Sequence, residues 1–350
     1  MSYSEIALIA GFAMLYSSIA GALERLPVNG PLVFVAFGFA LGPYGFGWFA
    51  GDMSSDGLRL VAEITLALVL FVDASRSDLK VLARYVELPQ RLILLALPLV
   101  ILLGIPTGLV IEGGLDLMSL AILAVIVAPT DAALGKPVVV NPRVPAEIRE
   151  GLNVESGLND GVCVPIFLAL LAAAAPRAAM DAEAFSGLAA GLFLQEIGIG
   201  AAVGAAVAAL AAAAVYTGVR NRWTNDHWLQ IPVVGAAVAC FAAAQALHGS
   251  GFIAAFVGGL LFGRLARRHP RARAAAAEGA GDVFAMLTWI TFGAAIVGQV
   301  WGAVSWSVAL YALLSLTAVR MLAVALALIG FALPPAQMLF IGWFGPRGLA

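Results

Sequence analysis

The chain has 350 residues, of which 62% are hydrophobic and only 11% are charged, and its formal net charge is −2. A mean hydropathy of +0.98 excludes a soluble fold of this size, so we expect an all-α polytopic protein in a lipid bilayer. No basic stripe with interleaved aromatic residues indicates a nucleic-acid partner. Cys163 and Cys240 lie far apart in apolar runs, which predicts two buried thiols, no disulfide and no bound cofactor.

Apolar runs alternate with breaks of glycine, proline and charged residues, and the length criterion of roughly 20 residues predicts twelve membrane spans. In chain order they lie near 5–23, 29–49, 58–75, 92–111, 117–139, 148–174, 187–216, 227–248, 250–265, 280–299, 303–331 and 336–350. Pro129 and Pro165 fall inside the fifth and sixth spans, so we expect both helices to be interrupted. In the seventh span, Gly198, Gly200 and Gly204 predict tight helix packing.

Basic residues are concentrated in alternate loops. Of the 19 Lys and Arg residues, 15 lie in or beside the loops that follow odd-numbered spans, whereas the loops after even-numbered spans hold two. The positive-inside rule therefore predicts that the N-terminus lies outside a plasma or inner membrane. The segment Met1–Glu5 lacks the basic region of a secretory signal, so we expect the first apolar run to remain as a helix.

The sixth span contains a polar run from Asn153 to Asp160. Glu155 and Asn159 are four residues apart, which places them in one column on a helix. Ser156 and Asp160 form the adjacent column, so the hydroxyl and the carboxylate face the same space. Low dielectric disfavours a bare carboxylate, so we predict that Asp160 holds either a proton or a partly dehydrated cation.

The fifth span contains Pro129-Thr130-Asp131. Pro129 removes a backbone donor and biases the preceding residue away from helical geometry, which frees carbonyl groups near Thr130. At helical rise Thr130 lies about 20 Å, and Asp160 about 18 Å, from the surface where each span begins, so both reach the middle of a core about 30 Å thick. Oxygen ligands beside a broken helix suit a monovalent cation. The predicted ion-binding residues are Asp160, Asp131, Ser156 and Thr130, of which Asp160 and Asp131 are the carboxylate ligands of transported Na⁺.

Three other charged residues have two interpretations each. Asp131 either binds the ion or caps a half-helix. Arg347 either offsets the carbonyl end of a half-helix or reaches the membrane interface. Asp73 either lines a cavity or pairs with Arg76 at spacing i, i+3, and we favour the pair. Arg320 lies deep in the eleventh span and is a natural buried partner for Glu155, in a structural role.

A second Gly/Pro break, Gly342–Gly348, lies in the twelfth span at a position that matches Pro129 in the fifth. If the seventh span links two six-helix units, the second unit is inverted, and two broken helices cross near the midplane. Paired breaks in inverted repeats indicate the binding site of a transporter. The second unit lacks its last helix, so we expect the natural sequence to continue beyond Ala350.

Together these motifs resemble the monovalent cation:proton antiporter family, in the NhaP-type branch of sodium/proton exchangers. The segments that carry the resemblance are Pro129–Asp131, Glu155–Asp160 and Gly345–Gly348, supported by Gly30–Val35, Thr65–Arg76 and Arg320–Leu322. The resemblance implies a homodimer of thirteen-helix protomers, each with a dimerisation domain and a moving core. It also implies an ion-binding Asp160, a Glu155 to Arg320 ion pair, and Asn159 as the neutral half of an Asn-Asp pair typical of electroneutral exchange. Many members have Thr-Asp-Pro at the first break, whereas here Pro129 precedes Thr130.

We therefore expect one transmembrane antiporter domain over 1–350, in which 1–111 with 187–265 form the scaffold and 112–174 with 280–350 form the ion-binding core. The expected function is exchange of Na⁺, or K⁺ or Li⁺, for H⁺, and not an enzymatic reaction. One alternative is an intramembrane aspartyl protease that uses Asp131 and Asp160 as a dyad, although the Gly-x-Gly-Asp pattern of such enzymes is absent. The other is an uncoupled cation channel or sensor on the same fold.

Overall fold

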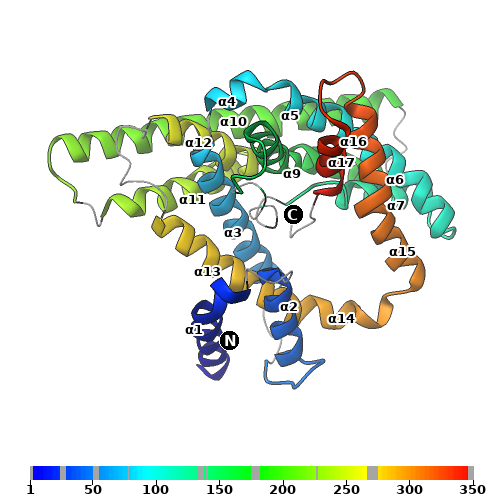
Figure 1. The fold of residues 1–350 in the computed structure, drawn as a ribbon, viewed down its shortest axis with the longest axis horizontal. Coiled ribbons are helices and arrows are strands. Elements are labelled where there is room, and N and C mark those ends of the chain that lie inside the picture. Colours follow the sequence, from blue (N-terminus) through cyan, green and yellow to red (C-terminus); the bar gives the residue numbers. More distant parts are fainter. Residues whose placement is uncertain are drawn as a thin grey trace. The chain divides into compact units, whose positions relative to one another are not determined.

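The computed structural model describes residues 3–23, 29–49, 55–77, 79–131, 134, 138, 141–174, 182–225, 228–265 and 275–345. Over these residues the regular structure is entirely helical, as expected (Figure 1). The chain divides into two compact units, of which the first is Met1–Thr65 with Gly279–Ser305 and the second is Leu66–Glu278 with Trp306–Ala350. The predicted scaffold and core have other bounds than these two units, and that division stays a prediction.

The first unit is built from helices at both ends of the sequence. Its elements are α1 (Tyr3–Leu23), α2 (Gly30–Leu41), the start of α3 (Ser55–Arg76), most of α13 (Ala275–Phe292), the π-helical turn η5 (Gly293–Val297), α14 (Gly298–Val300) and η6 (Trp301–Ala303). The rings of Phe12 and Phe37 stack with centroids 3.9 Å apart. The hydroxyls of Thr65 and Thr288 lie 3.0 Å apart, which joins α3 to α13 by a buried hydrogen bond.

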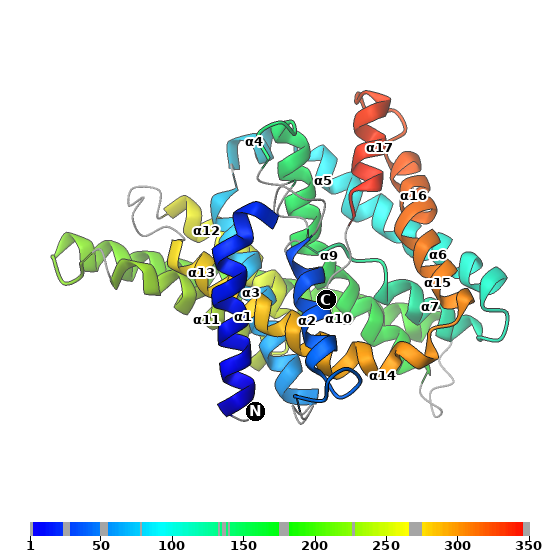
Figure 2. The ribbon, with the colours of Figure 1, turned by 60° about the horizontal axis from the view of Figure 1, so that its bottom comes forward.

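The second unit holds the remaining helices. They are α4 (Leu79–Arg84), α5 (Glu87–Arg91), η1 (Leu92–Ala96), α6 (Leu97–Ile111), α7 (Leu117–Ile126), α9 (Ala146–Ala174), α10 (Ala182–Arg220), η2 (Trp228–Gln230), α11 (Ile231–Ala246), α12 (Gly251–Leu265), α15 (Trp306–Leu314), η7 (Ser315–Val319), α16 (Arg320–Ala327) and α17 (Pro335–Trp343). The polar helix α9 packs against α5, α7, α10 and α12. On another side α15 and α16 contact α6, and α17 contacts α16 (Figure 2). The charged positions of α9 are therefore enclosed by helices.

Each of the twelve predicted spans contains a helix. Among the described residues, six helical segments are long and apolar enough to cross a membrane, and α2, α7, α11 and α12 are shorter apolar helices. The expected break in the fifth span is confirmed, because α7 ends at Ile126 and the chain is not helical through Asp131. The expected break at Pro165 is wrong, because α9 runs through it. Pro165 removes only one hydrogen bond, and a helix still satisfies the other backbone groups.

Tight packing of the seventh span is confirmed at two of its three named glycines. A Cβ at Gly200 would lie 2.7 Å from the Ser250 carbonyl oxygen, and one at Gly204 would lie 2.8 Å from the Ala254 Cα. Both belong to the contact between α10 and α12, where only glycine lets the backbones approach so closely. Gly198 has open space at its Cβ position, so the packing prediction is wrong there.

Replacement of Gly204 by leucine is expected to destabilise the protein by about 1–3 kcal/mol, because the new side chain forces α10 and α12 apart. The matched control is Gly191→Leu on the same helix, where a Cβ meets nothing within 4 Å. Thermal unfolding in detergent checks the pair, and equal midpoints for the two variants would contradict the packing argument.

Candidate ion-binding site

At the first break, backbone groups at the end of α7 lose their helical hydrogen-bond partners. The helix closes at Val127, and the Ala128 N–H donates to the Val125 carbonyl at 3.3 Å. Pro129 has no N–H and cannot continue the helix. Thr130 and Asp131 follow in non-helical backbone, each only 2% exposed. Their carbonyl and side-chain oxygens are therefore buried at a point where the helix no longer satisfies them.

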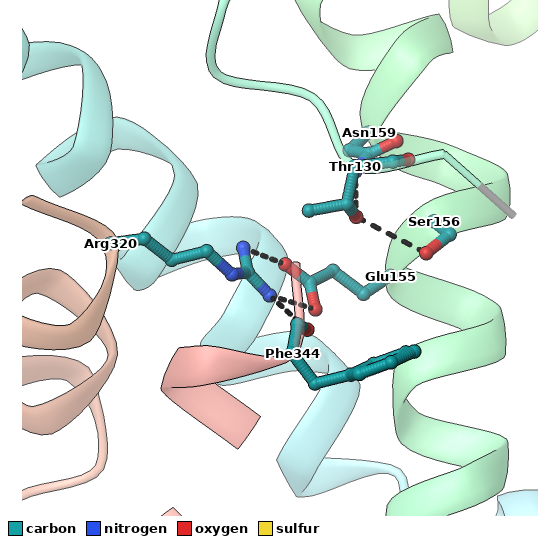
Figure 3. A network of polar contacts seen from close by, with 6 residues as sticks. All are labelled: Thr130, Glu155, Ser156, Asn159, Arg320 and Phe344. Carbon is teal, nitrogen blue, oxygen red and sulfur yellow. Dashed lines mark hydrogen bonds and ion pairs between the residues drawn. The ribbon is translucent and has the colours of Figure 1, made fainter. Parts of the chain in front are cut away.

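Three predicted residues meet at this break (Figure 3). The Asn159 Nδ2 donates to the Thr130 Oγ1 at 2.7 Å and to the Thr130 carbonyl oxygen at 3.2 Å. The hydroxyls of Thr130 and Ser156 lie 3.1 Å apart. Because Asn159 already donates to the Thr130 hydroxyl oxygen, the Thr130 hydrogen is available for Ser156. Asn159 thus does more than add polarity, since it holds the broken backbone against α9.

Asp160 follows Asn159 directly and is 2% exposed. It lies four residues after Ser156 in the uninterrupted helix α9, so both side chains belong to the same face. Burial at 2% exposure places the Asp160 side chain among the packed helices of the second unit. Its function as the ion-binding carboxylate stays a prediction.

Asp131 engages the chain that follows the break. Its Oδ1 accepts the Leu134 backbone N–H at 3.0 Å, and a carboxylate that accepts an N–H three residues later has the geometry of a helix N-cap. The capping interpretation of Asp131 is therefore supported by a contact. Binding of a cation by this residue stays a prediction.

Glu155 and Arg320 form the ion pair that the sequence predicts. The Arg320 Nη1 donates to Glu155 Oε1 at 2.8 Å, and Nη2 donates to Oε2 at 3.0 Å, with both side chains 2% exposed (Figure 3). This fork-to-fork geometry is strong and directional, and it cancels two charges that are costly to bury singly. Arg320 is the first residue of α16 and follows the π-helical turn η7, a feature that the sequence did not reveal.

The second break reaches the same ion pair. Helix α17 ends at Trp343, and the Arg320 Nη2 donates to the Phe344 carbonyl at 3.5 Å. A Cβ at Gly345 would collide with the Arg320 side chain, so glycine is needed for the guanidinium to pass. Arg347 lies outside the described residues. The two breaks are therefore connected through α9, the first by Asn159 and the second by Glu155 and Arg320.

Asp73 lies near the end of α3 and is half-buried, and its pairing with Arg76 stays a prediction. A neighbouring contact was not predicted from the sequence. The Asn153 Nδ2 donates to the Ser77 hydroxyl at 2.8 Å, and Ser77 donates to the Asp73 carbonyl at 3.4 Å. Asn153 stands at the start of the polar run of α9, which is the only signal that could have drawn attention to it.

Comparisons with known proteins identify the family and the fold. Residues 11–350 match the sodium/hydrogen exchanger transmembrane family. A curated relative, the K(+)/H(+) antiporter NhaP of Alkalimonas amylolytica, is 25% identical over 97% of this chain, which spans only 58% of that relative's length.

Two solved structures of the sodium proton antiporter MjNhaP1 from Methanocaldococcus jannaschii share the fold. One was determined at pH 8, with a TM-score of 0.73, 20% identity and coverage of 98% of this chain and 85% of the other. The second comes from an electron microscopy map, with a TM-score of 0.75, 20% identity and coverage of 99% and 83%. The predicted fold class and resemblance are confirmed. The chain belongs to the sodium/hydrogen exchanger family of membrane proteins.

Proposed function

We propose that this protein exchanges a monovalent cation for a proton by alternating access at one site centred on Asp160. The observation that carries the proposal is the burial of the Asp160 carboxylate on the continuous helix α9. The residue before it, Asn159, donates hydrogen bonds to Thr130 at the break after α7. The two named relatives are described as a K(+)/H(+) antiporter and a sodium proton antiporter, which supports K⁺ or Na⁺ as the transported ion. Li⁺ is the third candidate.

The oxygen atoms at the first break suit a cation that has lost part of its water. Thr130 has a carbonyl and a hydroxyl, Ser156 has a hydroxyl, and Asp131 has a carboxylate, one oxygen of which accepts the Leu134 N–H. Burial penalises a bare carboxylate, so Asp160 is neutralised by a proton or by the cation. Because a proton and a cation cannot occupy Asp160 together, movement of one across the membrane drives the other in the opposite direction.

Three neighbouring residues set the charge of the site without carrying ions. Glu155 and Arg320 cancel, so this pair adds no net charge beside Asp160. Asn159 is neutral and is occupied with Thr130. The site then has one titrating group fewer than it would have with an acid at position 159, which supports exchange of one cation for one proton.

The exchange is tested with the purified chain in liposomes that contain a pH-sensitive dye. An imposed outward cation gradient is expected to acidify the lumen, and the proton must move against its own gradient when the cation gradient is the larger. Na⁺, K⁺ and Li⁺ are compared at equal concentration. A cation flux that never moves protons uphill would support the channel or sensor alternative instead.

Thr130→Val is expected to raise the apparent KM for the cation about tenfold, because it removes a buried hydroxyl whose loss leaves Asn159 and Ser156 without that partner, at a cost of about 1–3 kcal/mol. Thr130→Ser keeps the hydroxyl and is the matched control. Initial exchange rates over a range of cation concentration check the pair. Equal KM values for the valine and serine variants would remove Thr130 from the site.

The remaining assignments extend the proposal. We infer a multi-pass protein of the plasma or inner membrane with its N-terminus outside, which acts as a homodimer. Residues 1–111 with 187–265 serve as the scaffold, and 112–174 with 280–350 serve as the moving core. The protease alternative is not favoured, because Asp131 uses one oxygen to cap the chain and the family consists of exchangers.

A further inference from the structure

A buried hydrogen bond ties the start of α9 to the end of α3. Ser77 directly follows α3, and Asn153 lies near the start of α9. The Asn153 Nδ2 donates to the Ser77 Oγ at 2.8 Å, and the two residues are only 6% exposed at Ser77 and 5% at Asn153. If the two helix ends separate, both polar groups lose their partner, so this contact holds the ends at a defined distance.

Asn153 lies on the face of α9 that carries Asp160. Asp160 is the seventh residue after Asn153 in a continuous helix, so the two side chains leave α9 in nearly the same direction. They are about 10 Å apart along the axis at helical rise. The positive-inside orientation predicts that the start of α9 faces the cytoplasm. On that orientation the hydrogen bond lies between the cytoplasm and the proposed ion-binding carboxylate.

The positions that follow Asn153 in the same helical column are glycines. Gly157 and Gly161 come four and eight residues after it, and both face α12. A Cβ at Gly157 would collide with the Phe256 ring, and one at Gly161 would collide with the Ile253 side chain. This column of α9 therefore presents a smooth surface to the side chains of α12, and Asn153 is its polar member.

Helix α12 meets its other neighbours through the backbone. A Cβ at Gly259 would collide with the Phe71 carbonyl of α3, and one at Gly263 would collide with the Ser75 carbonyl. Helix α10 approaches α12 in the same way at Gly204. Backbones this close have no side chain between them that could change rotamer, so α3, α10 and α12 form one rigid group. Against this group, the smooth column of α9 is suited to the small sliding movements of packed helices.

We propose that Asn153 and Ser77 form a latch, which fastens the start of α9 to this rigid group in one state of the transport cycle and opens when α9 moves. The proposal rests on the proposed function, which assigns Ser77 and α12 to the scaffold and α9 to the moving core. Movement of the core along the scaffold must break a side-chain hydrogen bond between them. Asn153 and Ser77 are thus positioning residues, and they bind no ion.

A reversible bridge across the latch tests the proposal. Ser77→Cys with Asn153→Cys is made in the full chain, placed in liposomes and treated with a short bifunctional thiosulfonate, because a hydrogen-bonded pair need not meet the geometry of a direct disulfide. The bridged protein is expected to lose cation-driven proton movement, and a reductant is expected to restore it. Mass spectrometry identifies the bridge. The unmodified chain receives the same treatment, since Cys163 and Cys240 are buried thiols.

The matched control places the same bridge within one helix. Arg59 and Glu63 lie 2.7 Å apart on one turn of α3, so Arg59→Cys with Glu63→Cys is expected to keep its exchange when bridged. An unmodified chain that does not exchange would reject the proposed function. If the unmodified chain exchanges and the bridged Ser77→Cys, Asn153→Cys variant exchanges as fast as its reduced form, the latch alone is rejected.

A second pair bridges the same helices and leaves the hydrogen bond intact. Ala74 and Val154 belong with Phe256 to one buried cluster, so Ala74→Cys with Val154→Cys joins the end of α3 to the start of α9. Its bridged form is expected to lose exchange and to regain it on reduction. Full exchange in this bridged form would overturn the proposal. Failure of both pairs to form a bridge would also overturn it, since the two helix ends would then not be in contact.

Discussion

Asp160→Asn is expected to lower cation-driven proton movement by about two to three orders of magnitude. Asparagine matches the shape of the side chain but carries neither a proton that can be released nor a charge that balances a buried cation. An unbalanced charge in a buried site costs about 3–5 kcal/mol, which corresponds to this loss. Initial rates of dye response in liposomes, measured at equal protein content, check the prediction.

The control applies the same chemical change to an exposed carboxylate. Asp116 is the N-cap of α7 and accepts the Ser119 backbone N–H at 2.6 Å, and this hydrogen bond lowers the pKa of the Asp116 carboxyl. Asparagine caps a helix about as well as aspartate, so Asp116→Asn is expected to leave exchange unchanged. Exchange that persists in Asp160→Asn would reject Asp160 as the carrier.

Glu155→Gln is expected to lower the free energy of unfolding by about 3–5 kcal/mol, because it leaves the buried Arg320 guanidinium without a counter-charge. Replacement of both residues by leucine is expected to recover most of this loss, since a buried pair is often no more stabilising than apolar residues of similar volume. The measurement is unfolding in detergent for Glu155→Gln and for the double leucine variant.

An exposed ion pair provides the comparison. Glu87 and Arg91 lie 2.9 Å apart on one helix, with Glu87 62% exposed, so Glu87→Gln is expected to change stability by less than about 1 kcal/mol. A Glu155→Gln variant as stable as Glu87→Gln, or a double variant no more stable than Glu155→Gln, would contradict the structural function assigned to the Glu155 to Arg320 pair.

The features predicted correctly from the sequence are those that follow from local chemistry. Runs of apolar residues located the helices, and Pro129 located the first break. The Glu155 to Arg320 contact was predictable although 165 residues separate its partners, because two opposite charges inside a membrane have few other ways to be neutralised. At Pro165 the same local rule failed, since one lost hydrogen bond does not end a long helix.

The features missed from the sequence depend on how separate segments meet. The hydrogen bonds from Asn159 to Thr130 require a particular backbone direction after the break. The spacing of residues along α9 gives no information about that direction. Likewise, the approach of the Phe344 carbonyl to Arg320 depends on where α17 ends. Asp131 shows the remaining difficulty, because capping and ion binding call for the same residue type and only the position of Leu134 reveals the cap.

The central claim is that a proton and a cation compete for one buried carboxylate. The most direct measurement is the apparent KM for the cation across a series of pH values set equally on both sides of the liposome. Competition at Asp160 predicts that, once the pH is low enough for the carboxylate to be mostly protonated, this KM rises about tenfold for each further unit of fall in pH, while the maximal rate is retained. A KM that does not change with pH would contradict the account.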